Sequence, residues 1–176
     1  ISKIRFDGRV LGEIIRNGVP SGFQNSVISI ANVFVQTNIN AFGKMAMAGC
    51  GSYAKIEGFA FLPVTCFTMA LTTFVSQNLG AKQYDRAKKG ARFGILCSVA
   101  IAELIGFVIY VAAPTLIAAF NSDPSVVHYG VMQARTIALF YFLLAFSHCI
   151  AAVLRGSGHA SIPMAVMLCV WCLFRV

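Results

Sequence analysis

The chain has 176 residues, of which 58% are hydrophobic and 11% are charged, and its mean hydropathy is +0.77. Soluble domains carry about 25% charged residues, so this composition excludes an ordinary soluble protein and indicates an all-α polytopic membrane protein built as a helical bundle. The formal net charge is +8, but the basic residues lie in short segments between apolar runs, which argues against a nucleic-acid partner.

The first segment, residues 1–18, predicts a basic amphipathic helix on the membrane surface. It carries four lysines and arginines, and Ile4, Leu11 and Ile15 share one side of a helical wheel. Pro20 is expected to begin the first membrane span, because a proline in the first turn of a helix loses no hydrogen bond.

The first expected span, residues 19–41, contains no charged residue. Its length suffices to cross a hydrocarbon layer of ~30 Å at ~1.5 Å per residue. Amides and hydroxyls recur along one side of this helix and form a polar stripe: Asn25, Ser29, Asn32, Gln36 and Asn40. Unsatisfied amides facing lipid cost several kcal/mol each. The polar stripe therefore faces either neighbouring helices, as hydrogen-bonding groups between them, or a substrate cavity, which is the interpretation we favour.

Residues 41–55 are expected to form a glycine-bearing loop, followed by a second span over residues 56–77. Pro63 should kink this span. A second, milder polar stripe follows one face of it: Thr65, Thr68, Thr72 and Ser76. These hydroxyls could line a cavity or bond to their own backbone.

A basic loop over residues 78–92 leads into a third span over residues 93–120. Glu103 is the acid inside this span, close to the middle of the bilayer. A carboxyl group at that depth is costly, which makes Glu103 a candidate for ion coupling through protonation. The alternative is a structural carboxyl that is neutral or paired with an arginine such as Arg135, which could instead bind a backbone carbonyl.

The fourth expected span covers residues 126–154 and carries Gln133 and Thr136 on one face. His148 is expected to be a hydrogen-bonded histidine within the bundle. The last span, residues 161–176, has too few residues to cross a bilayer comfortably, so we expect the chain to be a piece of a longer protein. Cys169 and Cys172 have C-x-x-C spacing but an apolar setting, so we expect packing residues, and no metal or cofactor.

The basic residues also predict an orientation. Four lie in the first segment, five in the loop after the second span and one in the turn after the fourth, against two in the loop after the first span. This asymmetry places the N-terminal segment in the cytoplasm of a multi-pass protein of the cell membrane.

Four sequence segments, in order, resemble the C-terminal lobe of multidrug and toxic compound extrusion transporters. They span nearly the whole chain: Gly18-Val19-Pro20 with Gln24; Gln77-Asn78-Leu79-Gly80-Ala81 followed by Ala87-Lys88-Lys89-Gly90; Leu116 to Phe120 with Asp123; and Leu154-Arg155-Gly156-Ser157-Gly158 followed by Ile162-Pro163-Met164. The resemblance implies half of a two-lobed, twelve-helix transporter, with helices seven to ten and part of eleven present. The partner of this half is then the N-terminal lobe of the same polypeptide, within the lipid bilayer.

The resemblance also implies antiport, in which Na⁺ or H⁺ entry drives export of small organic, often cationic, compounds by alternating access. The family's central cavity is lined by helices seven, eight and ten. The expected substrate-binding residues are therefore Asn25, Ser29, Asn32, Gln36, Thr68, Thr72, Gln133 and Thr136. The first and fourth spans contain no Asp or Glu, so the coupling carboxylates are expected in the other lobe.

Three other functions remain open at this point. A flippase for lipid-linked oligosaccharides of the same superfamily would have the same architecture with a more basic cavity. A membrane-embedded enzyme would need Glu103, His148 or the Cys169 and Cys172 pair, which lie on different spans at different depths, so we expect no enzyme. A structural membrane subunit would not need the polar stripe.

Overall fold

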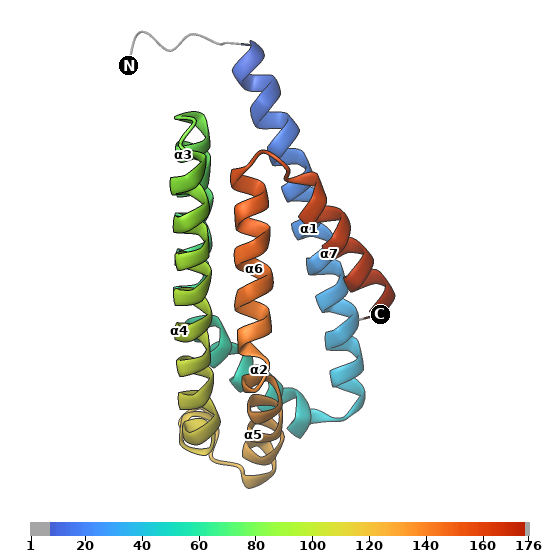
Figure 1. The fold of residues 1–176 in the computed structure, drawn as a ribbon. Helices are drawn as coiled ribbons and strands as arrows, with labels where there is room; N and C mark the ends of the chain where they lie inside the picture. Colours follow the sequence, from blue (N-terminus) through green and yellow to red (C-terminus); the bar gives the residue numbers. More distant parts are fainter. Residues whose placement is uncertain (1–7, 175–176) are drawn as a thin grey trace, which may run out of the picture.

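The computed structural model describes residues 8–174, and all the regular secondary structure in that part of the chain is helical (Figure 1). The helices are α1 (Gly8–Ala41), α2 (Lys44–Ala60), α3 (Leu62–Gly80), α4 (Tyr84–Ala118), α5 (Pro124–Ala138), α6 (Tyr141–Gly156) and α7 (Ser161–Phe174). The fold is therefore the all-α bundle that the composition predicts.

The bundle is organised around α4, which runs from one end of the molecule to the other (Figure 1). Helix α2 packs on α5 at one end, helix α3 packs on α6 at the other, and α4 contacts α3, α5 and α6. Helix α1 leans away and packs mainly against α7, with a smaller contact to α2. We name the two ends by their connections: the α3–α4 end, which carries the basic turn, and the α4–α5 end.

Two of the helical segments are interrupted. A single residue, Phe61, separates α2 from α3, and Pro63 lies in the first turn of α3. This confirms an interruption at the proline, where a missing N–H costs least. Helices α5 and α6 are bent by 55° at Leu139 and Phe140. The expected continuous span over residues 126–154 is thus two helices.

Length and hydropathy mark two candidates for membrane spans among the described helices, Lys44–Gly80, which includes the interruption at Phe61, and Tyr84–Ala118. The bent pair of α5 and α6 makes a third if it counts as one span. Helices α1 and α7 are not among these candidates. In α1 the polar stripe lowers the hydropathy, so the first and last expected spans stay predictions.

Three expectations about the connecting segments are wrong. Most of the expected loop over residues 41–55 belongs to α2, because residues with small or aromatic side chains recur with helical period and pack on α5. The basic loop is shorter than expected, since α4 already begins at Tyr84. Helix α1 begins at Gly8 rather than at Pro20, so the segments expected as a surface helix and as the first span form one continuous helix. Residues 1–7 of the expected lead-in lie outside the described part.

Small residues let the helices approach closely, as is usual in membranes. A Cβ atom added at Gly49 of α2 would lie 2.5 Å from the carbonyl oxygen of Val126 and 2.9 Å from the nitrogen of Gly130, both on α5. At the other end, a Cβ atom on Gly156 of α6 would lie 2.6 Å from the carbonyl oxygen of Thr72 on α3. Backbone therefore meets backbone at both ends of the bundle.

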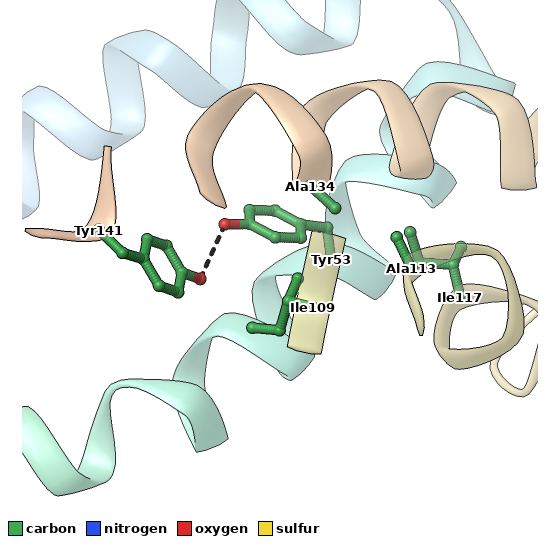
Figure 2. Packing of buried hydrophobic residues seen from close by; sticks show 6 residues of the cluster. All are labelled: Tyr53, Ile109, Ala113, Ile117, Ala134 and Tyr141. Carbon is green, nitrogen blue, oxygen red and sulfur yellow. Dashed lines mark hydrogen bonds between the residues drawn. The ribbon is translucent and has the colours of Figure 1, made fainter. Parts of the chain in front are cut away.

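The main buried cluster lies where α2, α5 and α6 pack against α4. It comprises Tyr53, Ile109, Ala113, Ile117, Ala134 and Tyr141 (Figure 2). The hydroxyl groups of Tyr53 and Tyr141 are 3.1 Å apart and hydrogen bonded to each other. Tyr141 is the first residue of α6, so this bond links α2 directly to the bend between α5 and α6.

Candidate functional site

The polar stripe of α1 lies on the exposed surface of the lobe. Asn25, Ser29, Asn32 and Gln36 are all exposed, whereas Ala31, on a neighbouring face, is the one buried residue among the α1 side chains that the structure describes. The Ser29 hydroxyl donates to the carbonyl of Asn25 at 2.9 Å, and the Gln36 amide donates to the Asn40 side chain at 3.1 Å. Both bonds stay within α1, so these groups do not connect helices within the described lobe. The stripe remains available to whatever lies outside this face.

The expected polar residues of α3 behave differently. Thr68 is buried, and its hydroxyl donates to the carbonyl of Thr65 at 2.7 Å. The Thr72 hydroxyl lies 2.8 Å from the carbonyl of Thr68 and 3.2 Å from the carbonyl of Ala152 on α6. Thr72 therefore joins α3 to α6 and has a structural role whatever else it does.

The strongest candidate site lies at the α4–α5 end, between α1, α2 and α5. It is a cavity of about 370 Å³ that includes two of the expected residues, Gln133 and Thr136. Its other lining residues come from the end of α1, the start of α2 and α5: Ile39, Phe42, Ala46, Cys50, Tyr129, Met132 and Ile137. We call this the Gln133 cavity. Apolar and aromatic walls with a few polar groups are typical of sites for small organic ligands.

The side-chain oxygen of Gln133 gives this cavity its chemistry. This Oε1 atom is buried and has no hydrogen-bond partner among the described residues. The Thr136 hydroxyl is already used, because it donates to the carbonyl of Met132 at 2.8 Å. A buried amide oxygen without a donor costs about 1–3 kcal/mol, and a turn of this side chain toward the cavity would let an N–H or O–H group of a ligand remove that cost.

A second pocket, of about 280 Å³, lies between α3 and α6 towards the α3–α4 end. Thr68, Thr72 and Thr73 line it, together with Met69 and the half-buried Arg155. The eight expected substrate-binding residues thus divide into three groups: four on the exposed face of α1, two in the Gln133 cavity and two beside Arg155. The lobe alone does not bring them into one site.

Glu103, the ion-coupling candidate, is exposed on α4 beside the exposed apolar residues Leu104 and Phe107. It is not paired with Arg135, which instead donates from Nε to the carbonyl of Tyr110 at 3.4 Å and lies over the ring of that tyrosine. Of the two alternatives for Arg135, the backbone carbonyl is therefore the one observed.

The remaining candidates have structural partners. The Nδ1 atom of His148 lies 2.9 Å from the carbonyl of Leu144, and its ring packs edge-on against Phe61. This confirms a hydrogen-bonded histidine within the bundle. Cys169 is a free thiol, and the side chain of Cys172 lies outside the described atoms.

Sequence reasoning missed the α2 wall of the Gln133 cavity, because residues 41–55 were assigned to a loop. The signal was present: Ala46, Gly49 and Tyr53 are spaced as one face of a helix and are buried. Arg155 was also missed, since it was considered only as part of a turn motif.

The family model described as MatE matches residues 20–176 of the chain. The chain belongs to the MatE family. Its relatives include the probable multidrug resistance protein NorM of Thermotoga maritima, 28% identical over 160 residues, which covers 90% of this chain and 34% of the relative. The probable multidrug resistance protein YoeA of Bacillus subtilis is 23% identical, with coverage of 94% and 36%. The FAD transporter of Shewanella oneidensis is 22% identical, with coverage of 85% and 33%.

Solved structures show the same fold. A MOP superfamily transporter from Pyrococcus furiosus, described as having a binding pocket of reverse polarity, superposes with a TM-score of 0.86 at 19% identity and covers 92% of this MatE chain. A MATE protein solved in complex with MaD5 superposes equally well. The chain spans about a third of the length of the curated relatives and of these structures. Membership of this family places the chain in a membrane.

Proposed function

We propose that this MatE chain is the C-terminal lobe of an exporter of small organic compounds, and that the Gln133 cavity contacts the exported compound. The carrying observation is the buried, unpartnered Oε1 of Gln133 in a cavity of about 370 Å³ with apolar and aromatic walls. Such a cavity suits amphiphilic compounds that have an aromatic or aliphatic body and an N–H donor, which includes protonated amines. The relatives named multidrug resistance proteins support export as the activity.

The test compares two classes of compound in cells that express the full-length protein. In Gln133→Leu, efflux of a protonated secondary amine should fall about 10-fold or more, because a hydrogen bond from a charged donor contributes about 1.5–3 kcal/mol. Efflux of a tetraalkylammonium compound, which has no N–H group, should change little. Gln77→Leu, at an exposed position on α3, is the matched control. Equal loss for both compounds would mean that Gln133 does not recognise the donor.

We further propose that Na⁺ or H⁺ entry drives this export through alternation of two lobes around a central site. Glu103 is the acid of α4 that could take part, because an exposed carboxyl among apolar side chains must find a proton or a partner within the membrane. If Glu103→Gln leaves the dependence of efflux on external pH and Na⁺ unchanged, coupling belongs to carboxylates outside this lobe.

The orientation belongs to the same proposal, with the N-terminal segment in the cytoplasm. Lys88 lies in the early turns of α4, and Asp123 lies beyond the other end of α4, at the start of α5. Cysteines placed at these two positions in a cysteine-free background should react with a membrane-impermeant thiol reagent from opposite sides. Labelling of both from one side would contradict the expected topology.

A second function to consider comes from one relative, the FAD transporter of Shewanella oneidensis. FAD is an anionic dinucleotide, and its export would need a cationic contact in the transport path. The residues lining the Gln133 cavity are uncharged, so this lobe favours neutral and cationic compounds there.

A further inference from the structure

The pocket between α3 and α6 contains a guanidinium group without a partner. Arg155 lies in the last turn of α6 and is half-buried. The structure gives its guanidinium no hydrogen bond and no ion pair with any described residue, although a guanidinium has five N–H donors. No carboxylate is among the residues that line the pocket with it. A half-buried, unpaired cation is costly and indicates a ligand of opposite charge.

The threonine hydroxyls of the pocket are not bonded to the guanidinium of Arg155 in the structure. The hydroxyl hydrogens of Thr68, Thr72 and Thr73 are directed to backbone carbonyls of α3, with oxygen–oxygen distances of 2.7, 2.8 and 3.1 Å. These bonds hold the threonine side chains in place as the wall of the pocket. The donors that remain free in the pocket are those of Arg155.

The surroundings add to the positive charge. Gly156 packs against Thr72 and Val75, and Gly90 of α4 packs against Phe74, so Arg155 and the start of α4 lie at the same end of the lobe. Against one exposed acid, Asp85, that end carries five further exposed basic residues: Lys82, Arg86, Lys88, Lys89 and Arg92. Their combined field attracts anions to the surface, while the shape of the pocket selects Arg155 as the point of contact.

We propose that the Arg155 pocket binds an oxyanion of the phosphate type. The planar guanidinium fork makes two parallel hydrogen bonds to such a group, and about 280 Å³ is enough room for a phosphate but not for a whole drug-sized molecule. The phosphate can be that of an anionic lipid headgroup or of a free anion. This site is separate from the Gln133 cavity and does not depend on the proposed export.

The experiment measures thermal stabilisation of purified, delipidated full-length protein by two probes. One is inorganic phosphate, and the other is phosphatidylglycerol presented in mixed micelles, with phosphatidylcholine as the zwitterionic control. Wild-type protein should be stabilised by at least one of the two anionic probes. Stabilisation by phosphate identifies a free-anion site, and stabilisation by phosphatidylglycerol alone identifies a headgroup site.

Arg155→Gln should weaken apparent affinity for the effective probe about 10- to 100-fold, because the lost bonds are charge-assisted. Arg155→Lys, which keeps the charge but not the fork, should fall in between. The matched control is Lys89→Gln, which removes the same charge at the same end from an exposed position outside the pocket and should retain affinity within about 2-fold.

A steric variant covers the case in which Arg155→Gln does not fold. Thr73 is exposed at the pocket wall, so Thr73→Phe should fill the pocket while leaving Arg155 intact, and binding should again be lost. The proposal is overturned if neither anionic probe stabilises the wild type. It is also overturned if Lys89→Gln loses as much affinity as Arg155→Gln, or if Thr73→Phe binds normally.

Discussion

The two ends of this lobe use the same scaffold helix but hold their helices together by different means. At the α4–α5 end, α2 and α5 meet through Gly49 and Gly130, and a cavity opens beside the contact. At the α3–α4 end, α3 and α6 meet through Gly156 and through a threonine hydroxyl bonded across the interface. The first contact depends on shape alone, whereas the second adds a directional bond. Each end thus combines a close backbone approach with a pocket, and the two ends differ in the directional bond.

The largest expected effect breaks the shape-dependent contact. In Gly49→Ala the new methyl group meets backbone atoms of Val126 and Gly130, which cannot move without separating the helices. We expect a loss of about 3 kcal/mol in the free energy of unfolding. A thermal melt of the full-length protein in detergent measures it.

Gly51→Ala is the matched control for that substitution. Gly51 is exposed on the same helix and has nothing within 4 Å of the added atom. Its replacement should stabilise α2 by about 0.5–1 kcal/mol, because alanine favours helix. Similar losses in both variants would show that the substitutions act through helix propensity and not through the contact with α5.

The next effect concerns the link between the two ends. Tyr53→Phe leaves the buried hydroxyl of Tyr141 without its partner and should cost about 1–3 kcal/mol. The double variant Tyr53→Phe with Tyr141→Phe should be less destabilised than the two single changes added together. Strict additivity in a double-mutant cycle, read from thermal melts, would mean that the two hydroxyls do not interact.

A smaller effect tests the directional bond between α3 and α6 at the α3–α4 end. Thr72→Val keeps the shape of the side chain but removes its bond to the carbonyl of Ala152, which should cost about 0.6–1 kcal/mol. Thr73→Val is the matched control, since the hydroxyl of Thr73 bonds only within α3. If both variants melt at the same temperature, the α3–α6 contact depends on shape as much as the α2–α5 contact does.

The smallest expected effect concerns the turn between α3 and α4. Lys82 has a φ of 58°, a left-handed conformation in which a side chain is strained. Lys82→Gly should therefore stabilise the protein by about 0.5 kcal/mol. The opposite sign in a thermal melt would mean that the lysine side chain makes a compensating contact at this end.

The main elements of this fold follow from the sequence, but its breaks follow only in part. Pro63 marks the interruption beside Phe61, because a proline cannot continue the hydrogen-bonding pattern of the preceding turn. The 55° bend at Leu139 and Phe140 has no such marker, since residues 131–155 contain neither glycine nor proline. It depends on tertiary contacts instead: Gly106 of α4 leaves room for the carbonyl of Ala138 and for the ring of Tyr141.

The candidate sites, like the breaks in the helices, could be predicted from the sequence only in part. Gln133 and Thr136 could be identified because they share a helical face, which periodicity reports. The association of Gln133 and Thr136 with α2 could not be predicted, because it needs the close approach of Gly49 to α5. Arg155 could not be identified as unpaired, because the absence of a partner is a property of the packed helices and not of the turn motif around it.

The continuity of α4 has a consequence for the insertion of this lobe into the membrane. Helices α5 and α6 have 15 and 16 residues, so each is shorter than the ~20 residues that a spanning helix needs. Helix α4 has 35 residues and contains a more apolar stretch than the candidate span Lys44–Gly80. During synthesis α4 can therefore partition into lipid by itself, whereas the bent pair that follows must enter as one bent unit and pack against α4. Charged substitutions in the middle of α4 should therefore reduce the membrane insertion of this helix before any tertiary structure exists.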